Sequence, residues 1–85
     1  MQKLPSLELT SAEIRSAFAS GTWAEKFPPI LDVELAAELA RVPVNTIYDW
    51  SSRGQLKGCA RRVGKYLRVH RDRLVSLIFN EGINQ

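Results

Sequence analysis

The sequence predicts a small, mainly α-helical domain that carries one β-hairpin. Its 85 residues suffice for one domain, and 45% apolar with 25% charged residues is an ordinary globular composition. Apolar residues recur with helical spacing over residues 11–20, 32–40, 44–53 and 72–80, but they alternate with polar ones over 59–70. The expected order is therefore helix, two helices joined by a short turn, hairpin and helix, folded as one compact domain.

Residues 1–30 are expected to form an N-terminal extension with one helix, at about 11–20. Thr10 and Glu13 have the spacing of a capping box, in which each side chain accepts a hydrogen bond from the backbone N–H of the other residue. Gly21 can adopt the left-handed conformation that ends many helices. The extension is thus predicted to start and stop its helix with local signals.

Residues 31–82 are expected to form the main unit, which opens with two short helices. Asp32 is a suitable N-cap for the first, and Pro43 fits the first turn of the second, where its missing N–H would have no partner. Gly54 is expected to stop the second helix. That helix should bury Val44, Ile47 and Trp50 and turn outward Asn45, Thr46, Asp49, Ser52 and Arg53, with Tyr48 near the boundary.

The hairpin and a closing helix complete this unit. Gly64-Lys65 predicts a tight turn, because glycine readily adopts the positive φ that two-residue hairpin turns need. Val63, Leu67 and Val69 alternate with Arg62, Arg68 and His70, which is the period of two of a β-strand. The last helix should end at Gly82.

Charge is distributed unevenly along the chain. Residues 1–50 carry four basic and seven acidic side chains, whereas residues 51–85 carry eight basic and two acidic ones. Seven of those eight precede the first acid of that half, Asp72, and are Arg53, Lys57, Arg61, Arg62, Lys65, Arg68 and Arg71. We expect them to form a basic patch without local ion-pair partners. Such a patch fits a protein that meets a polyanion, although charge alone fits a solvated face equally well.

The two short helices supply the second indication of function. Helices joined by so short a turn cross at a steep angle, and the second then projects an outer face that fits the major groove of DNA. The hairpin that follows would lie along the adjacent backbone or minor groove as a wing. The expected fold is a winged helix-turn-helix preceded by an extra N-terminal helix. The candidate DNA-binding residues are Asn45, Thr46, Tyr48, Asp49, Arg53, Arg61, Arg62, Lys65 and Arg68.

The same residues resemble a known family. Residues 31–50, LDVELAAELARVPVNTIYDW, look like the helix-turn-helix of excisionase-type and MerR-related DNA-binding domains. Residues 53–56, 62–69 and 71–74 resemble the family's next segment, its wing and the start of its closing helix. The resemblance implies double-stranded DNA binding by a cytoplasmic protein of a bacterium, phage or mobile element. It suggests an excisionase-like recombination directionality factor or a small transcription regulator, associated with the nucleoid when bound to DNA.

Three residues depart from the family pattern. Arg41 stands where the family usually has glycine, and Pro43 replaces a usual serine cap, so the turn is expected to differ slightly. Asp49 stands where a basic residue is frequent. Because a carboxylate repels phosphate, Asp49 is expected either to accept from a cytosine amine or to cap neighbouring arginines.

Other chemistry is not expected from this sequence. Cys59 and His70 lack a third orienting group, so we expect no enzyme, and they are too few for a metal site. No cofactor or small-molecule effector is expected, because no effector domain or long dimerisation helix follows. The longest apolar runs, such as residues 74–79, are far shorter than a membrane span, so we expect no membrane partner and a cytoplasmic location.

Several alternatives stay open at this point. The protein can act as several copies on DNA or beside an integrase-like protein. A different class of function is a protein-interaction module, in which the N-terminal helix with Trp23 and Phe27 docks a partner and the helix-turn-helix is a scaffold. RNA binding is disfavoured, because no aromatic pair is expected on the exposed face of a sheet.

Overall fold

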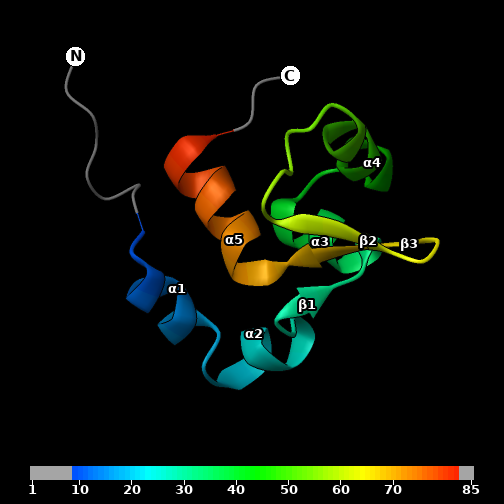
Figure 1. The fold of residues 1–85 in the computed structure, drawn as a ribbon. Coiled ribbons are helices and arrows are strands. Elements are labelled where there is room, and N and C mark those ends of the chain that lie inside the picture. The colour runs from blue at the N-terminus through cyan, green and yellow to red at the C-terminus, as the bar shows by residue number, and fades with distance from the viewer. Residues whose placement is uncertain (1–8, 83–85) are drawn as a thin grey trace, which may run out of the picture.

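The computed structural model describes residues 9–82, and the predicted fold class is confirmed: a mostly helical chain with a small antiparallel sheet (Figure 1). The elements are α1 (Ser11–Ala17), α2 (Gly21–Lys26), β1 (Ile30–Leu31), α3 (Val33–Ala40), α4 (Val44–Ser52), β2 (Ala60–Val63), β3 (Tyr66–His70), α5 (Arg71–Ser76) and the short π-helix η2 (Leu77–Glu81). Two of them, α2 and β1, were not expected from the sequence.

The N-terminal extension holds two helices, so the prediction of one helix at about 11–20 is wrong. The capping box of Thr10 and Glu13 is present as predicted, but α1 ends at Ala17. Gly21 does have positive φ, at 85°, yet it opens α2 instead of only closing α1. The signal for α2 was weak because its six residues contain few apolar side chains, and its one large apolar side chain, Trp23, is 57% exposed.

The hairpin belongs to a three-stranded sheet with the strand order β1-β3-β2. Strand β1 pairs with the base of β3 through Ile30 opposite His70 and Leu31 opposite Val69. A strand of two residues is too short to show an alternating pattern, which is why the sequence did not reveal it. The turn at Gly64 has φ of 62°, as a two-residue hairpin requires.

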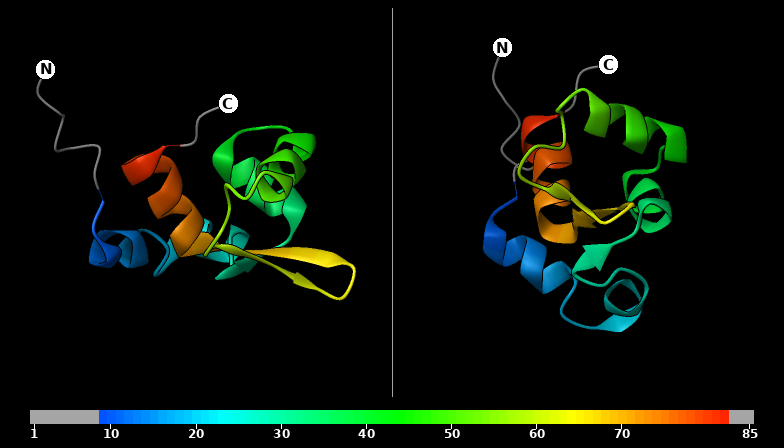
Figure 2. Two further views of the ribbon diagram at one scale, coloured as in Figure 1. Left: turned by 45° about the horizontal axis from the view of Figure 1, so that its top comes forward. Right: turned by 45° about the vertical axis from the view of Figure 1, so that its right-hand side comes forward.

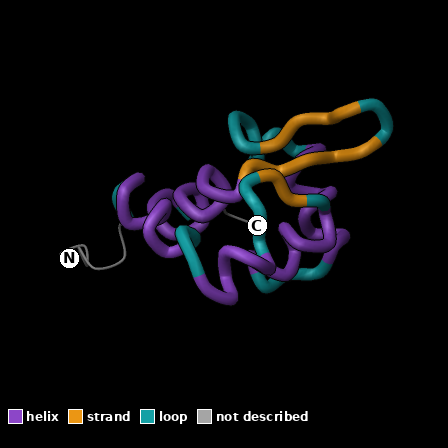
Figure 3. Tube along the Cα trace, turned by 90° about the horizontal axis from the view of Figure 1, so that it is seen from below, coloured by secondary structure: helices purple, strands orange, loops and turns teal. Residues whose placement is uncertain are grey.

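The apolar residues of the hairpin do not all reach the core. Leu67 and Val69 are buried, whereas Val63 is 57% exposed. Val63 pairs with Tyr66 next to the turn, so it lies on the opposite face from Leu67 and beyond the edge of the core. In Figure 2 and Figure 3 the hairpin accordingly projects past the helical body.

The helix-turn-helix formed by α3 and α4 follows the prediction closely. Asp32 caps α3 by accepting a 2.8 Å hydrogen bond from the N–H of Leu35. Arg41 adopts the left-handed conformation, with φ 61° and ψ 46°, and it alone among the described non-glycine residues has positive φ. A glycine would adopt this conformation without strain, whereas Arg41 adopts it at a cost in free energy.

The closing helix covers the predicted residues and ends at Gly82 as expected, but it is less regular than predicted. An α-helix runs over Arg71–Ser76 and continues as the wider η2 to Glu81, after which Gly82 ends it with φ of 78°. The side chain of Asn80 donates to the backbone oxygen of Leu9 and accepts from its N–H. The two ends of the described chain are therefore joined.

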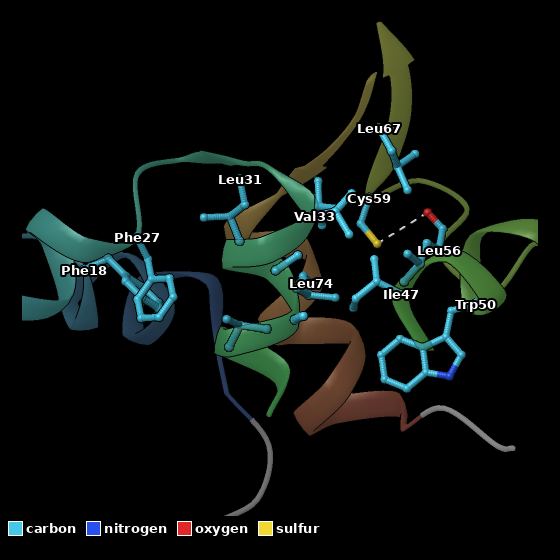
Figure 4. Packing of buried hydrophobic residues seen from close by; sticks show 14 of the residues in the cluster. Phe18, Phe27, Leu31, Val33, Ile47, Trp50, Leu56, Cys59, Leu67 and Leu74 are labelled. Atoms are coloured by element: carbon cyan, nitrogen blue, oxygen red, sulfur yellow. Dashed lines mark hydrogen bonds between the residues drawn. The ribbon is translucent and has the colours of Figure 1, made fainter. Parts of the chain in front are cut away.

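The hydrophobic core unites both parts of the chain (Figure 4). Leu31, Ile47, Leu56, Leu74 and Val69 are its most completely buried large side chains. Phe27 from the extension is also buried, at 4% exposure. The core therefore fixes the inner side of α4 and the base of the hairpin, and leaves the outer side of α4 for contacts elsewhere.

Candidate nucleic-acid interface

The outer side of α4 is open to solvent. Ile47 and Trp50 anchor the helix in the core, while Asn45 and Tyr48 are exposed and Thr46 is half-buried. An amide, a phenol and a hydroxyl can each donate and accept hydrogen bonds, which is what contacts with base edges and phosphates require. The predicted outward direction of this face is confirmed.

The two charged candidates on α4 form an ion pair with each other. The Nε of Arg53 lies 3.2 Å from an Oδ of Asp49, one helical turn earlier. Of the alternatives left open for Asp49, the structure thus places it beside a neighbouring arginine. The expectation that Arg53 has no local acidic partner is wrong, because the periodicity of the helix brings position i+4 onto position i.

The wing, defined here as the hairpin of residues 60–70, carries cations on both of its faces. Arg61 pairs with Arg68 across the strands, on the same face as Val63 and Tyr66. Arg62 pairs with Leu67 and lies on the other face. Lys65 occupies the turn, so positive charge reaches the tip of the wing as well as its two sides.

Tyr66 is a wing residue that sequence reasoning missed. Its side chain is 53% exposed, with the Lys65 Nζ at 5.6 Å and the Arg68 Cζ at 5.0 Å from the centre of its ring. These contacts hold two cations against one aromatic ring. The alternation of the strand was a usable signal, since it places Tyr66 on the same side as Arg68.

A groove connects α4 with the wing. It is lined by Tyr48 of α4, by the start of α3 and by the wing, and its residues are Asp32, Val33, Glu34, Tyr48, Lys65, Tyr66, Leu67 and Arg68. In Figure 1 α4 and the tip of the wing both lie on the right-hand side, whereas α1 lies on the left. The helix and the basic hairpin therefore border one surface.

Two of the predicted patch residues do not act as free cations. Arg53 is paired with Asp49, and Arg71 is 8% exposed, with its side chain bonded to the Phe27 carbonyl and to Asp72. Arg71 was expected in the exposed patch, but it is buried because it stands at the junction of β3 and α5, next to the core. The remaining wing cations Arg61, Arg62 and Lys65 are exposed, and Arg68 is half-buried.

The contacts of Cys59 and His70 are those of residues that stabilise the fold. The Cys59 thiol donates to the Leu56 carbonyl inside the core, and burial raises its pKa to about 11 (Figure 4). The Nδ1 of His70 caps α5 by accepting from the N–H of Arg73. Within residues 9–82, no three His, Cys, Asp or Glu side chains are grouped to hold a metal ion, and no helix is long and apolar enough to cross a bilayer.

A short two-helix motif with an open second helix and a basic wing beside it defines a winged helix-turn-helix, a class of protein that binds DNA. The comparison with protein families agrees, since residues 30–78 match the model described as a helix-turn-helix domain. The chain belongs to this family, and its helix-turn-helix supports binding of double-stranded DNA. The comparisons with curated proteins and with solved structures find no match.

Proposed function

We propose that the protein recognises a specific sequence in double-stranded DNA, with α4 in the major groove and the wing on the flanking backbone or minor groove. The observation that carries this proposal is the shared groove between Tyr48 on α4 and Lys65, Tyr66 and Arg68 on the wing. One helix fits a major groove, and the next backbone then passes beside it. That backbone would meet the cations of the wing.

The candidate residues divide into two groups by position. Asn45, Thr46 and Tyr48 lie on the helix that would enter the groove, where their side chains could address base edges or the nearest phosphates. The wing cations Arg61, Arg62, Lys65 and Arg68 would neutralise phosphates. If about four to six phosphates are contacted, log K should fall with log salt at a slope of roughly −4 to −5.

The division can be tested by titrating labelled duplexes at several salt concentrations. Arg62→Ala should weaken binding to all sequences alike and make the slope less steep by about 0.9, because one phosphate contact is lost. Asn45→Ala should keep the slope and lose preference at one base pair of a site selected from a random pool. Arg15→Ala, which removes an exposed cation on α1, serves as the matched control and should change neither property.

The proposal has two clear ways to fail. Absence of binding to any duplex, even at low salt, would contradict DNA recognition itself. Equal losses on selected and random DNA for both Arg62→Ala and Asn45→Ala would contradict the separation between base contacts and phosphate contacts.

For the biological role, we propose an excisionase-like recombination directionality factor or a small transcription regulator, acting on DNA in the cytoplasm and without catalysis. A single module of this size covers little DNA, so tight binding would need several copies or an integrase-like partner. Excision assays with an integrase encoded beside the gene would separate the two roles. Stimulation of excision supports the first, and repression of a reporter without such stimulation supports the second.

One observation favours a second candidate function, the docking of a protein partner on the extension. Trp23 is 57% exposed and lines a groove between α2 and α3. Phe27 is buried, so of the two aromatic residues named from the sequence only Trp23 is available for contact. A partner captured by the wild type and by Arg62→Ala, but not by Trp23→Ala, would support docking. Capture that is unchanged in Trp23→Ala would reject it.

A further inference from the structure

The ion pair on α4 gives Arg53 a particular arrangement. The contact with Asp49 uses Nε, 3.2 Å from the carboxylate, and the two side chains are 56% and 43% exposed. Within the part of the chain that the structure describes, no hydrogen bond to the two terminal nitrogens of Arg53 is found. Both Nη groups therefore remain available to a ligand in solvent, while the charge of the guanidinium is already balanced.

The direction of the side chain matters for what that ligand is. Side chains on a helix lean toward its N-terminus, so Arg53, at the C-terminal end of α4, extends back over Asp49. The N-terminal part of a recognition helix is the part that contacts base edges. The contact with Asp49 therefore holds the guanidinium of Arg53 beside the last turns of α4, on the side of the helix that Asp49 shares with Asn45 one turn earlier.

We infer that Asp49 is a positioning residue that turns Arg53 from a phosphate-binding cation into a reader of one guanine in the DNA site. This inference rests on the proposed function. Two parallel donors on one guanidinium match the O6 and N7 acceptors that guanine presents in the major groove. The ion pair at Nε favours the rotamers that keep the guanidinium beside Asp49, so that fewer rotamers compete with the bidentate geometry.

The carboxylate of Asp49 also affects how well the protein distinguishes cognate from non-cognate DNA. Asp49 lies on the face that approaches DNA, where its charge repels phosphate and balances the charge of Arg53. Non-cognate DNA, which is held mainly through phosphates, therefore gains little from Arg53. Cognate DNA gains the base contact, and the difference between the two is specificity.

The test combines a salt titration with a base-preference measurement for four proteins: the wild type, Asp49→Ala, Arg53→Ala and the double variant. The salt titration uses a random duplex, and the base preference uses a site selected from a random pool by the wild type. Glu25→Ala removes an exposed acid on α2 and is the matched control for net charge. Because the pair is exposed, all variants should fold, which circular dichroism checks.

On random DNA, Asp49→Ala should make the salt slope steeper by about 0.9, because the released Arg53 becomes one more phosphate contact. Arg53→Ala and the double variant should keep the slope of the wild type. On the selected site, both single variants should lose the preference for guanine at one position by about 5- to 150-fold, the range for one bidentate pair. Glu25→Ala should behave as the wild type in both measurements.

Several results would overturn the inference. An unchanged slope in Asp49→Ala, or a guanine preference that survives in it, shows that Asp49 does not position Arg53. A steeper slope that persists in the double variant, or that appears in Glu25→Ala, shows a general effect of charge. These results differ from failure of the proposed function, in which the wild type itself binds no duplex.

Discussion

Arg71 offers the sharpest test of how the extension is joined to the helix-turn-helix. Its Nη1 donates a 2.9 Å hydrogen bond to the Phe27 carbonyl, and its Nε lies 2.8 Å from Asp72. Its guanidinium carbon lies 4.3 Å from the centre of the Phe18 ring. With 8% exposure, this one side chain binds both the extension and the start of α5.

The magnitude can be worked from these contacts. A hydrogen bond to a charged group contributes about 1.5–3 kcal/mol, and a partly desolvated cation–π contact contributes about 0.5–2 kcal/mol. Because the contacts share one side chain they are not additive, and Arg71→Ala should lower the free energy of unfolding by about 2–5 kcal/mol. Arg71→Lys keeps the charge but lacks the planar guanidinium with its fixed donors. It should therefore lower the free energy of unfolding by roughly half as much.

Equilibrium unfolding in urea measures these changes, with Arg73→Ala as the control. Arg73 is an exposed neighbour on α5 whose Nη1 donates to the Gly58 carbonyl, and because solvent screens this exposed contact, its loss should cost at most about 1 kcal/mol. Arg71→Lys should also keep the salt slope of DNA binding, because Arg71 is not part of the DNA-facing surface. If Arg71→Ala unfolds within about 1 kcal/mol of the wild type, this account of the junction is wrong.

Two further changes in stability follow from the structure. Arg41→Gly should be more stable than Arg41→Ala by about 0.5–1 kcal/mol, because only glycine removes the strain of the left-handed turn; equal urea midpoints and slopes would contradict this. The Cys59 pKa is raised by burial from 9.0 to about 11, so the associated stability is fully present below pH 9 and is lost as the pH rises through 11. That loss is at most about 3 kcal/mol relative to Cys59→Ala, and parallel unfolding curves for the two proteins between these pH values would refute it.

The features that the sequence predicted well depend on local chemistry. The capping box at Thr10, the N-cap at Asp32 and the turn at Gly64 each involve a few neighbouring residues with one favoured conformation. The buried positions Ile47 and Trp50 followed from helical periodicity. These signals were enough to define the helix-turn-helix and the hairpin, and with them the class of function.

The features that the sequence did not reveal depend on contacts between distant residues. Strand β1 exists because Ile30, the last residue of the extension, and Leu31 pair with the base of β3, which no local pattern records. Arg62 and Arg71 look alike in sequence, as cations in one basic run, yet the first is exposed on the wing and the second is buried against Phe27. Only the fold of the extension separates a cation that can meet DNA from one that holds the protein together.

The extension also determines how the wing is held. At the base of the wing, β1 pairs with Val69 and His70, and the N–H of Arg71 donates a 2.8 Å hydrogen bond to the Pro29 carbonyl. The tip, from Val63 to Tyr66, has no such pairing with β1. A hairpin of two strands alone is only marginally stable in water, and a third strand at its base gives it a fixed direction. The extension therefore contributes to the candidate interface without lining the groove, because it fixes the base from which the cations of the wing project beside α4.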